Sequence, residues 1–376
     1  KPSTKAAWQC SQCRSASSQV RQPASVISGA DELARARQYC FDMLRKSDRP
    51  SSIMVAFIPP QARDAYIALR AFNVDVARTA DTTSTPTIGS MRLQFQRDAV
   101  TKALAGSPPK QPIAILLAHA AEDLAIRSEG RARWSRNWLV RIVDTREKYL
   151  SNQPYPDLAS LERYAENTYS TLLYLTLQAL PMASLAADHI ASHIGKASGI
   201  TAVLRGLPVI AFPGPPNSHS NQGHFAGDVG ASRHAAVTLP LDVMARHGVR
   251  EEDVLRNGSS AHGLRDAVFE VATRANDHLI TARQMLASIR AGQEAGHEFE
   301  HADEEEHNYQ DPSDRHKESP MQEIDRSFGV FMPAVATQLW LDRLQKRDFD
   351  VFAPNLRITD WRLPWRAFWA WNRRNF

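Results

Sequence analysis

The sequence predicts an all-α protein. Apolar residues recur at three- and four-residue steps through several long segments, most clearly 61–81, 189–210 and 264–290. Prolines and glycines separate these segments, as is typical at helix ends. The chain has 376 residues, of which 43% are hydrophobic and 23% charged. A chain of this size and composition can bury one large helical core.

Residues 189–210 are expected to form a buried central helix. Its apolar stripe consists of Ile190, Ile194, Ala197, Ile200 (or Thr201) and Leu204. The small residues in this segment, among them Gly195 and Gly199, would allow another helix to approach closely. Gly206 and Pro208 predict the end of the helix.

The remaining helices are predicted from the same periodicity and from their capping residues. In chain order they cover residues 30–47, 61–81, 87–100, 113–127, 135–150, 157–180, 264–290 and 324–346. In the third of these, Met91, Phe95 and Val100 are expected to be buried.

Charge and cysteine content exclude two classes of protein. The net charge of +4 is spread along the chain, so nucleic acid is not expected as a partner. Three cysteines exclude a disulfide scaffold. Cys10 and Cys13 form a CxxC motif without a second pair, which leaves zinc or redox chemistry and an incidental pair as alternatives.

Residues 1–29 differ in composition from the helical domain predicted over 30–376. They are rich in serine and basic residues, with no acidic residue before Asp31. This composition is typical of the remnant of a mitochondrial transit segment, and an ordinary disordered terminus is the alternative. No uninterrupted apolar run reaches the roughly 18 residues that a membrane-spanning helix needs.

Histidines suggest two candidate metal sites. His219, His224 and His234 lie in the irregular segment 211–234, which would otherwise be a mobile surface loop. His189 and His193 lie one helical turn apart and could ligate a metal, or could be packed and hydrogen bonded. No third ligand is visible near His189 and His193, so no metal site is assigned.

Two segments near the C-terminus have unusual compositions. Residues 292–322 are strongly acidic and are expected to be a disordered insertion, either a solvated linker or a docking arm. The tail 355–376 alternates aromatic and basic residues, including Trp361, Trp365, Arg366 and Trp369. Such a short helix suits a membrane interface or partner contact, or docking onto the protein's own core.

Several motifs resemble those of squalene and phytoene synthases. The resemblance is carried by Ile194-Gly195-Lys196-Ala197, Val203-Leu204-Arg205, Tyr66, Leu69-Arg70, Tyr164 and Leu239-Pro240-Leu241-Asp242. It implies an isoprenoid-synthase-type bundle around a central cavity. It also implies two pairs of aspartates four residues apart, which in this family hold Mg²⁺ against a prenyl diphosphate.

The aspartates themselves are absent from the matching positions, which hold Asn73, Ala77, Gly206 and Ile210. Carboxylates at that spacing would lie on one helix face about 6 Å apart and suit Mg²⁺. Asp75 would point away from the Asn73–Ala77 face. Asp81 could reach a cavity mouth or could be a solvated helix end.

A further difference concerns glycines that line the prenyl tunnel in synthases. Their places hold larger residues, Thr168, Ser170, Leu172 and Leu173. We expect these side chains to narrow any tunnel.

A second resemblance is to mitochondrial complex I assembly factors of the same superfamily. It is carried by 344–356 (LQKRDFDVFAPNL), 189–200 (HIASHIGKASGI) and 70–74 (RAFNV), and it covers roughly 31–290 and 323–370. It implies a non-catalytic protein on the matrix side of the inner membrane that binds complex I subunits or assembly intermediates, with no catalytic residue and no cofactor. The alternatives are an active prenyl-diphosphate transferase with altered metal ligands and a lipid carrier that uses the cavity.

Overall fold

The computed structural model describes residues 29–83, 85–182, 184–213, 235–293, 298–301 and 319–376. These residues form helices and connecting loops, with no strand among them, which confirms the predicted all-α class. The predicted leader 1–29 lies almost wholly outside the described residues, together with Cys10 and Cys13. His219, His224 and His234 also lie outside them.

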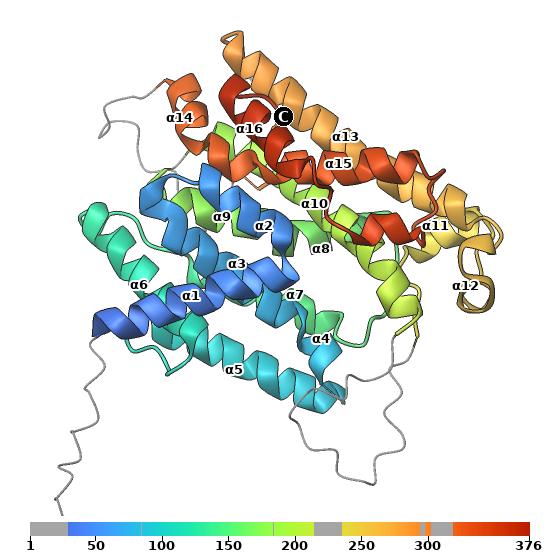
Figure 1. Ribbon diagram of the computed structural model, residues 1–376, viewed down its shortest axis with the longest axis horizontal. Coiled ribbons are helices and arrows are strands. Elements are labelled where there is room, and N and C mark those ends of the chain that lie inside the picture. The colour runs from blue at the N-terminus through green and yellow to red at the C-terminus, as the bar shows by residue number, and fades with distance from the viewer. Residues whose placement is uncertain (1–28, 84, 183, 214–234, 294–297, 302–318) are drawn as a thin grey trace, which may run out of the picture.

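The N-terminal half supplies one side of the bundle (Figure 1). Its helices are α1 (Gly29–Ser47), α2 (Arg49–Met54), α3 (Arg63–Ala77), α4 (Thr79–Thr82), α5 (Pro86–Leu104), α6 (Pro112–Arg127) and α7 (Arg136–Lys148). Helices α1, α3 and α6 contact one another, and α5 lies against α6 and α7. The expected helix 61–81 is therefore present as α3 and α4, which meet at Arg78.

The C-terminal half begins in the middle of the molecule and ends on its opposite side. Its helices are α8 (Leu158–Ala165), the π-helical turn η3 (Glu166–Ser170), α9 (Thr171–Gln178), α10 (Leu185–Ala211), α11 (Leu241–Arg246), α12 (Glu251–Asn257), α13 (Leu264–Arg290), α14 (Pro320–Ser327), the 3₁₀ turn η6 (Phe328–Phe331), α15 (Pro333–Gln345) and α16 (Leu363–Arg373). Helices α2, α11 and α12 have no counterpart among the helices predicted from the sequence. One helix was predicted over 157–180 and one over 324–346, and in each case a π or 3₁₀ turn divides the segment.

Helix α10 is the central element, as its apolar stripe predicts. It packs against α8, η3 and α9 on one side and against α13 and α15 on the other (Figure 1). By length and composition it is the one helix of the described part that could cross a membrane, and 56% of its most apolar window is buried within the bundle. Its apolar character is therefore explained by its place in the core.

The predicted end of α10 is wrong by several residues. The helix continues through Gly206 and Pro208 to Ala211. Leu207, Pro208 and Ala211 are buried, so packing of the last turn compensates for the hydrogen bond that proline cannot donate.

The predicted inward face of α5 is also wrong in part. Met91 and Phe95 are 69% and 48% exposed, whereas Val100 is buried as expected. The helix turns Leu93 and Gln96 inward instead. The periodicity of this segment is weak, so neighbouring helices rather than the local pattern determine which face is buried.

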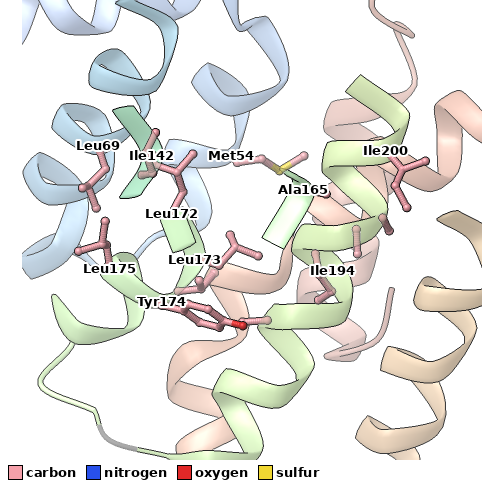
Figure 2. Close-up of a cluster of buried hydrophobic side chains, with 14 of the residues drawn as sticks. Met54, Leu69, Ile142, Ala165, Leu172, Leu173, Tyr174, Leu175, Ile194 and Ile200 are labelled. Atoms are coloured by element: carbon pink, nitrogen blue, oxygen red, sulfur yellow. The ribbon is translucent and has the colours of Figure 1, made fainter. Parts of the chain in front are cut away.

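Leucines from α9 fill the centre of the bundle (Figure 2). Leu172, Leu173 and Leu175 are at most 1% exposed. They lie among side chains from α2, α3, α7 and α10, such as Met54, Leu69, Ile142 and Ile194.

Close packing of α10 on η3 predicts the effect of adding a methyl group. A Cβ at Gly195 would lie 2.3 Å from Ser170 Cα and 2.5 Å from Ser170 N, both backbone atoms. We expect Gly195→Ala to lower the free energy of unfolding by about 1–3 kcal/mol. The matched control is Gly206→Ala in the same helix, where the nearest atom to the new Cβ is Ile210 Cδ1 at 3.9 Å.

The control should stabilise the protein by about 0.5–1 kcal/mol because alanine favours helix more than glycine does. Denaturant unfolding measures both changes. Equal effects of the two substitutions would contradict a close contact at Gly195.

Candidate functional site: a cationic cavity beside the central helix

A cavity of about 210 Å³ lies between α3, α10, α15 and the turn that leads into α2. Its wall is formed by Ser47, Asp48, Pro50, Ser51, Met54, Arg70, Asn73, Val74, Ala77, Arg78, Tyr169, Ser198, Thr201, Ala202, Arg205, Pro333, Ala336, Thr337 and Trp340. The family resemblance led us to expect a central cavity, and this is where α3 and α10 face each other across one. Its volume is below the roughly 300–1,000 Å³ of typical small-molecule sites.

Positive charge dominates the cavity. Arg70, Arg78 and Arg205 line it, and Asp48 is its one acidic lining residue. The Asp48 carboxylate accepts a hydrogen bond of 3.3 Å from the backbone N–H of Ser51, so it caps α2. Such a cavity can donate hydrogen bonds to an anion or a carbonyl group.

Two donor groups in the wall are buried without a hydrogen-bond partner in the described part of the chain. They are Arg70 Nε and Thr201 Oγ1. Arg70 is only 5% exposed and lies over the Tyr66 ring, 5.4 Å from its centroid. Sequence reasoning used Arg70 only as a family marker and gave it no role.

The four positions that the resemblance matches to synthase aspartates are not all in the wall. Asn73 and Ala77 line the cavity, whereas Gly206 and Ile210 do not. Helix α10 presents Thr201, Ala202 and Arg205 to this cavity instead.

The other acidic residues of this region face elsewhere. The Asp75 carboxylate accepts a hydrogen bond of 2.5 Å from Gln96 Nε2, on the far side of α3 from the cavity. Burial raises the pKa of Asp75, although the Gln96 hydrogen bond opposes this shift. Asp81 is exposed and does not line the cavity.

The Asn73 side chain is held by an arginine from α7. Arg146 donates a hydrogen bond of 3.1 Å from Nη2 to Asn73 Oδ1, and another to the Tyr164 hydroxyl. Its guanidinium also lies 5.2 Å from the Tyr164 ring centroid and 5.7 Å from that of Tyr169. Sequence reasoning missed Arg146, because nothing in its local pattern distinguishes it from a surface arginine.

This donor set does not fit Mg²⁺. The ion takes oxygen ligands, chiefly carboxylates together with phosphate and water. The Asn73 oxygen is already bonded to a guanidinium, and the lining carboxylate of Asp48 caps a helix. In the described residues, no group of three His, Cys, Asp or Glu side chains is arranged to hold a metal ion.

The residues expected to narrow a prenyl tunnel are all in the core. Thr168, Ser170, Leu172 and Leu173 are each at most 1% exposed. Leu172 and Leu173 belong to the leucine cluster of Figure 2. Space that a glycine would leave open is filled by these side chains.

His189 and His193 belong to a second polar cluster rather than to the cavity. Their rings stack with centroids 5.4 Å apart, and His193 Nδ1 lies 2.9 Å from His278 Nδ1. His278 Nε2 in turn lies 2.7 Å from Glu162 Oε1. The two Nδ1 atoms share a hydrogen bond, and the tautomers of the two rings decide which of them donates.

Glu162 anchors this cluster. It accepts from Arg274 Nε at 2.7 Å as well as from His278. Although burial acts against the charged form, hydrogen bonds from His278 and Arg274 lower the pKa of Glu162 to about 2. The histidine pair is therefore part of a packed hydrogen-bond chain between α8, α10 and α13.

Four residues of the acidic segment 292–322, at positions 298–301, are described between two undescribed stretches. Phe299 is buried 5.1 Å from His189 between ring centroids, and Glu300 pairs with Lys196 at 3.0 Å. This contact was not predicted, because the acidic composition of the segment indicated disorder and gave its one phenylalanine no weight.

Three tryptophans of the C-terminal tail are not docked onto the protein's own core, although Trp371 packs against Phe57 and Phe328. Trp361, Trp365 and Trp369 are 79%, 65% and 55% exposed. The helix packs through Leu363 and Ala367 instead. Of the two interpretations of the tail, self-docking is therefore wrong for these three tryptophans.

The fold and the cavity define a class of protein. The chain belongs to the squalene/phytoene synthase family, whose family model matches residues 44–217 and 224–369. Solved structures support the same fold at low sequence identity. A dehydrosqualene synthase superposes with a TM-score of 0.60 at 13% identity, covering 92% of this chain and 99% of that one. The squalene synthase HpnC from Alicyclobacillus acidocaldarius gives 0.56 at 12%, with 85% and 96% covered.

Within this family, the chain is similar to proteins from several animals that share the same name. The mouse protein named "NADH dehydrogenase (ubiquinone) complex I, assembly factor 6" is 34% identical over 358 residues, covering 95% of this chain and 88% of its own. The human protein of that name is 34% identical over 326 residues, with 87% and 79% covered. The Drosophila melanogaster homologue is 30% identical over 346 residues, with 90% and 84% covered.

The bonds of Arg146 predict its contribution to stability. We expect Arg146→Met to lower the free energy of unfolding by about 2 kcal/mol, since Asn73 Oδ1 and the Tyr164 hydroxyl lose their donor. Arg136→Met, at the exposed start of the same helix, should change it by less than about 0.5 kcal/mol. Chemical denaturation measures both, and an unchanged midpoint for Arg146→Met would show that these bonds contribute nothing.

Proposed function

We propose that the chain is a non-catalytic assembly factor for mitochondrial respiratory complex I. It would be a pseudoenzyme derived from head-to-head prenyl synthases, acting on the matrix side of the inner membrane. Its partners would be complex I subunits or assembly intermediates. The names of its relatives in mouse, human and fly support the assembly role.

The proposal that the chain is not catalytic depends on the hydrogen bonding of Asn73. At a position where synthases place a metal-binding carboxylate, this chain has an amide whose oxygen is bonded to Arg146. Ala77, one turn further along, offers no oxygen at all. Ionisation of a prenyl diphosphate by Mg²⁺ therefore lacks its anchor on α3, and no residue is assigned a catalytic role.

One observation favours the alternative of an active prenyl-diphosphate transferase. Arg70, Arg78 and Arg205 could bind a diphosphate directly, without a metal. The other alternative, a lipid carrier, is opposed by the cavity volume of about 210 Å³ and by the leucines that fill the core beside it.

We expect the purified protein not to consume farnesyl or geranylgeranyl diphosphate in the presence of Mg²⁺. The physical reason is the missing carboxylate pair on α3. Release of pyrophosphate and loss of substrate are measured against a buffer blank, with a squalene synthase as positive control. Mg²⁺-dependent turnover above the blank would establish the transferase and refute the pseudoenzyme.

We expect deletion of the protein in cells that carry it to remove assembled complex I while sterol and carotenoid levels stay normal. Native gels of solubilised mitochondria measure the first and lipid extracts the second. Re-expression of the chain with Asn73→Ala should restore complex I, because the proposal gives the cavity no catalytic task. Normal complex I in the deletion strain would refute the assembly role.

Affinity capture from mitochondria, with identification of the recovered proteins, would name the partners. Recovery of complex I subunits would support the assembly role. Capture on the same resin without the protein provides the background.

A further inference from the structure

Large apolar side chains are concentrated on one exposed part of the surface, formed by α16 and the loop before it. Ile358, Trp361, Trp365, Phe368 and Trp369 are between 48% and 79% exposed. Single exposed apolar residues are ordinary on protein surfaces, but five within twelve positions form a patch. We call residues 358–373 the aromatic face.

Helical geometry explains why these side chains point away from the protein. At about 100° per residue, Trp365, Phe368 and Trp369 share one side of α16. Leu363 and Ala367 lie on the other side and are buried. Helix α16 lies against α15 at the surface of the bundle (Figure 1). The side with the aromatics is therefore not used by the fold.

The charges around the aromatic face are almost all positive. Residues 355–376 contain five arginines and a single acidic side chain, Asp360. Asp360 is bonded by the Arg362 guanidinium at 2.7 Å and its side chain is only 8% exposed. The one acidic side chain within 355–376 is therefore paired with an arginine.

Two of the arginines border a groove next to the aromatics. Arg366, Trp369 and Arg373 line a depression of about 360 Å³ between α15 and α16. Arg373 lies over the Trp369 ring with its guanidinium carbon 5.4 Å from the centroid. Guanidinium groups in this position can form paired hydrogen bonds with a phosphate.

We propose that the aromatic face binds the surface of an anionic lipid bilayer. The tryptophans enter the headgroup region, where an amphipathic ring is stable, and Arg366 and Arg373 bind lipid phosphates. With 11 residues, α16 is too short to cross a bilayer and lies in the plane of the surface. A protein partner fits less well, since the face offers it cations and aromatics and its one acidic side chain, Asp360, is already paired with Arg362.

Vesicle flotation tests the proposal with the whole chain. The protein is mixed with vesicles of phosphatidylcholine alone or with about 30% phosphatidylglycerol. We expect flotation with the anionic vesicles, much weaker flotation with the neutral ones, and loss of binding as salt is raised.

Two variants separate the aromatic and the cationic contributions. Trp361→Ala/Trp365→Ala/Trp369→Ala and Arg366→Glu/Arg373→Glu should each weaken binding roughly tenfold or more. The matched controls are Tyr39→Ala/Met91→Ala/Ile126→Ala, which removes exposed apolar side chains elsewhere, and Arg131→Glu/Arg256→Glu, which makes the same change in charge. The controls should bind like the unaltered chain, and circular dichroism verifies that all variants are folded.

Tryptophan fluorescence provides a direct test of contact with lipid. Brominated lipids quench tryptophans that enter the bilayer, so quenching should be strong for the unaltered chain and largely lost in the triple tryptophan variant. Failure of the unaltered chain to float with anionic vesicles would overturn the proposal. Equal binding by the triple tryptophan variant and its control, Tyr39→Ala/Met91→Ala/Ile126→Ala, would overturn it as well. Loss of captured mitochondrial proteins in the tryptophan variant, with vesicle binding unchanged, would instead identify the face as a protein-binding surface.

Discussion

The close approach of α10 to the segment α8–η3 is the constraint on which the rest of the structure depends. At Gly195 and Gly199 the helices are so near that a Cβ would lie within 3 Å of backbone atoms of Ser170 and Ala165. Any side chain there would push α10 outward, and α13 and α15 pack on its other side. The position of half of the bundle therefore depends on two residues without side chains.

This contact also determines what the cavity can be. With α10 held close, the leucines of α9 fill the centre of the bundle, and only about 210 Å³ remains between α3, α10 and α15. Asn73, in the wall of this cavity, accepts a hydrogen bond from Arg146 of α7. The Arg146 guanidinium is a permanent positive charge of the chain itself, in contrast to a metal ion, which must be bound from solution. In place of paired carboxylates that a metal ion would balance, this chain has an amide at Asn73 bonded to Arg146, and three arginines in the cavity wall.

The sequence predicts the helices well where their apolar period is strong. The segment 264–290 is a helix with the predicted bounds, and 189–210 is the centre of the bundle. It fails where tertiary contacts override local signals. Packing of Leu207 and Ala211 carries α10 past Pro208, and the neighbours of α5 determine that Leu93 rather than Met91 is buried.

The site was predictable only in part, for a related reason. The family resemblance located Asn73 and Ala77 in the cavity wall, because both lie in a segment with clear helical register. It used Arg205 only as a family marker, and it could not locate Arg146, since a contact between distant helices leaves no trace in the spacing of either one. Gly206 and Ile210 do not line this cavity, because α10 presents a neighbouring face to it. A match between sequence motifs therefore indicates which residue occupies a family position more reliably than it indicates which way that residue faces.

The distribution of apolar side chains between the interior and the surface indicates which part of this chain is suited to binding. A synthase needs an internal apolar channel, and in this chain the corresponding positions are closed by Leu172 and Leu173. Apolar side chains are instead exposed on the outside, at Trp361, Trp365 and Trp369, where each costs hydration free energy as long as it faces water. A fold that retained such a face without a partner would gain stability and solubility by replacing the tryptophans with polar residues. The closed interior and the exposed aromatics are thus both consistent with the proposed role, in which the chain binds its partners at its surface.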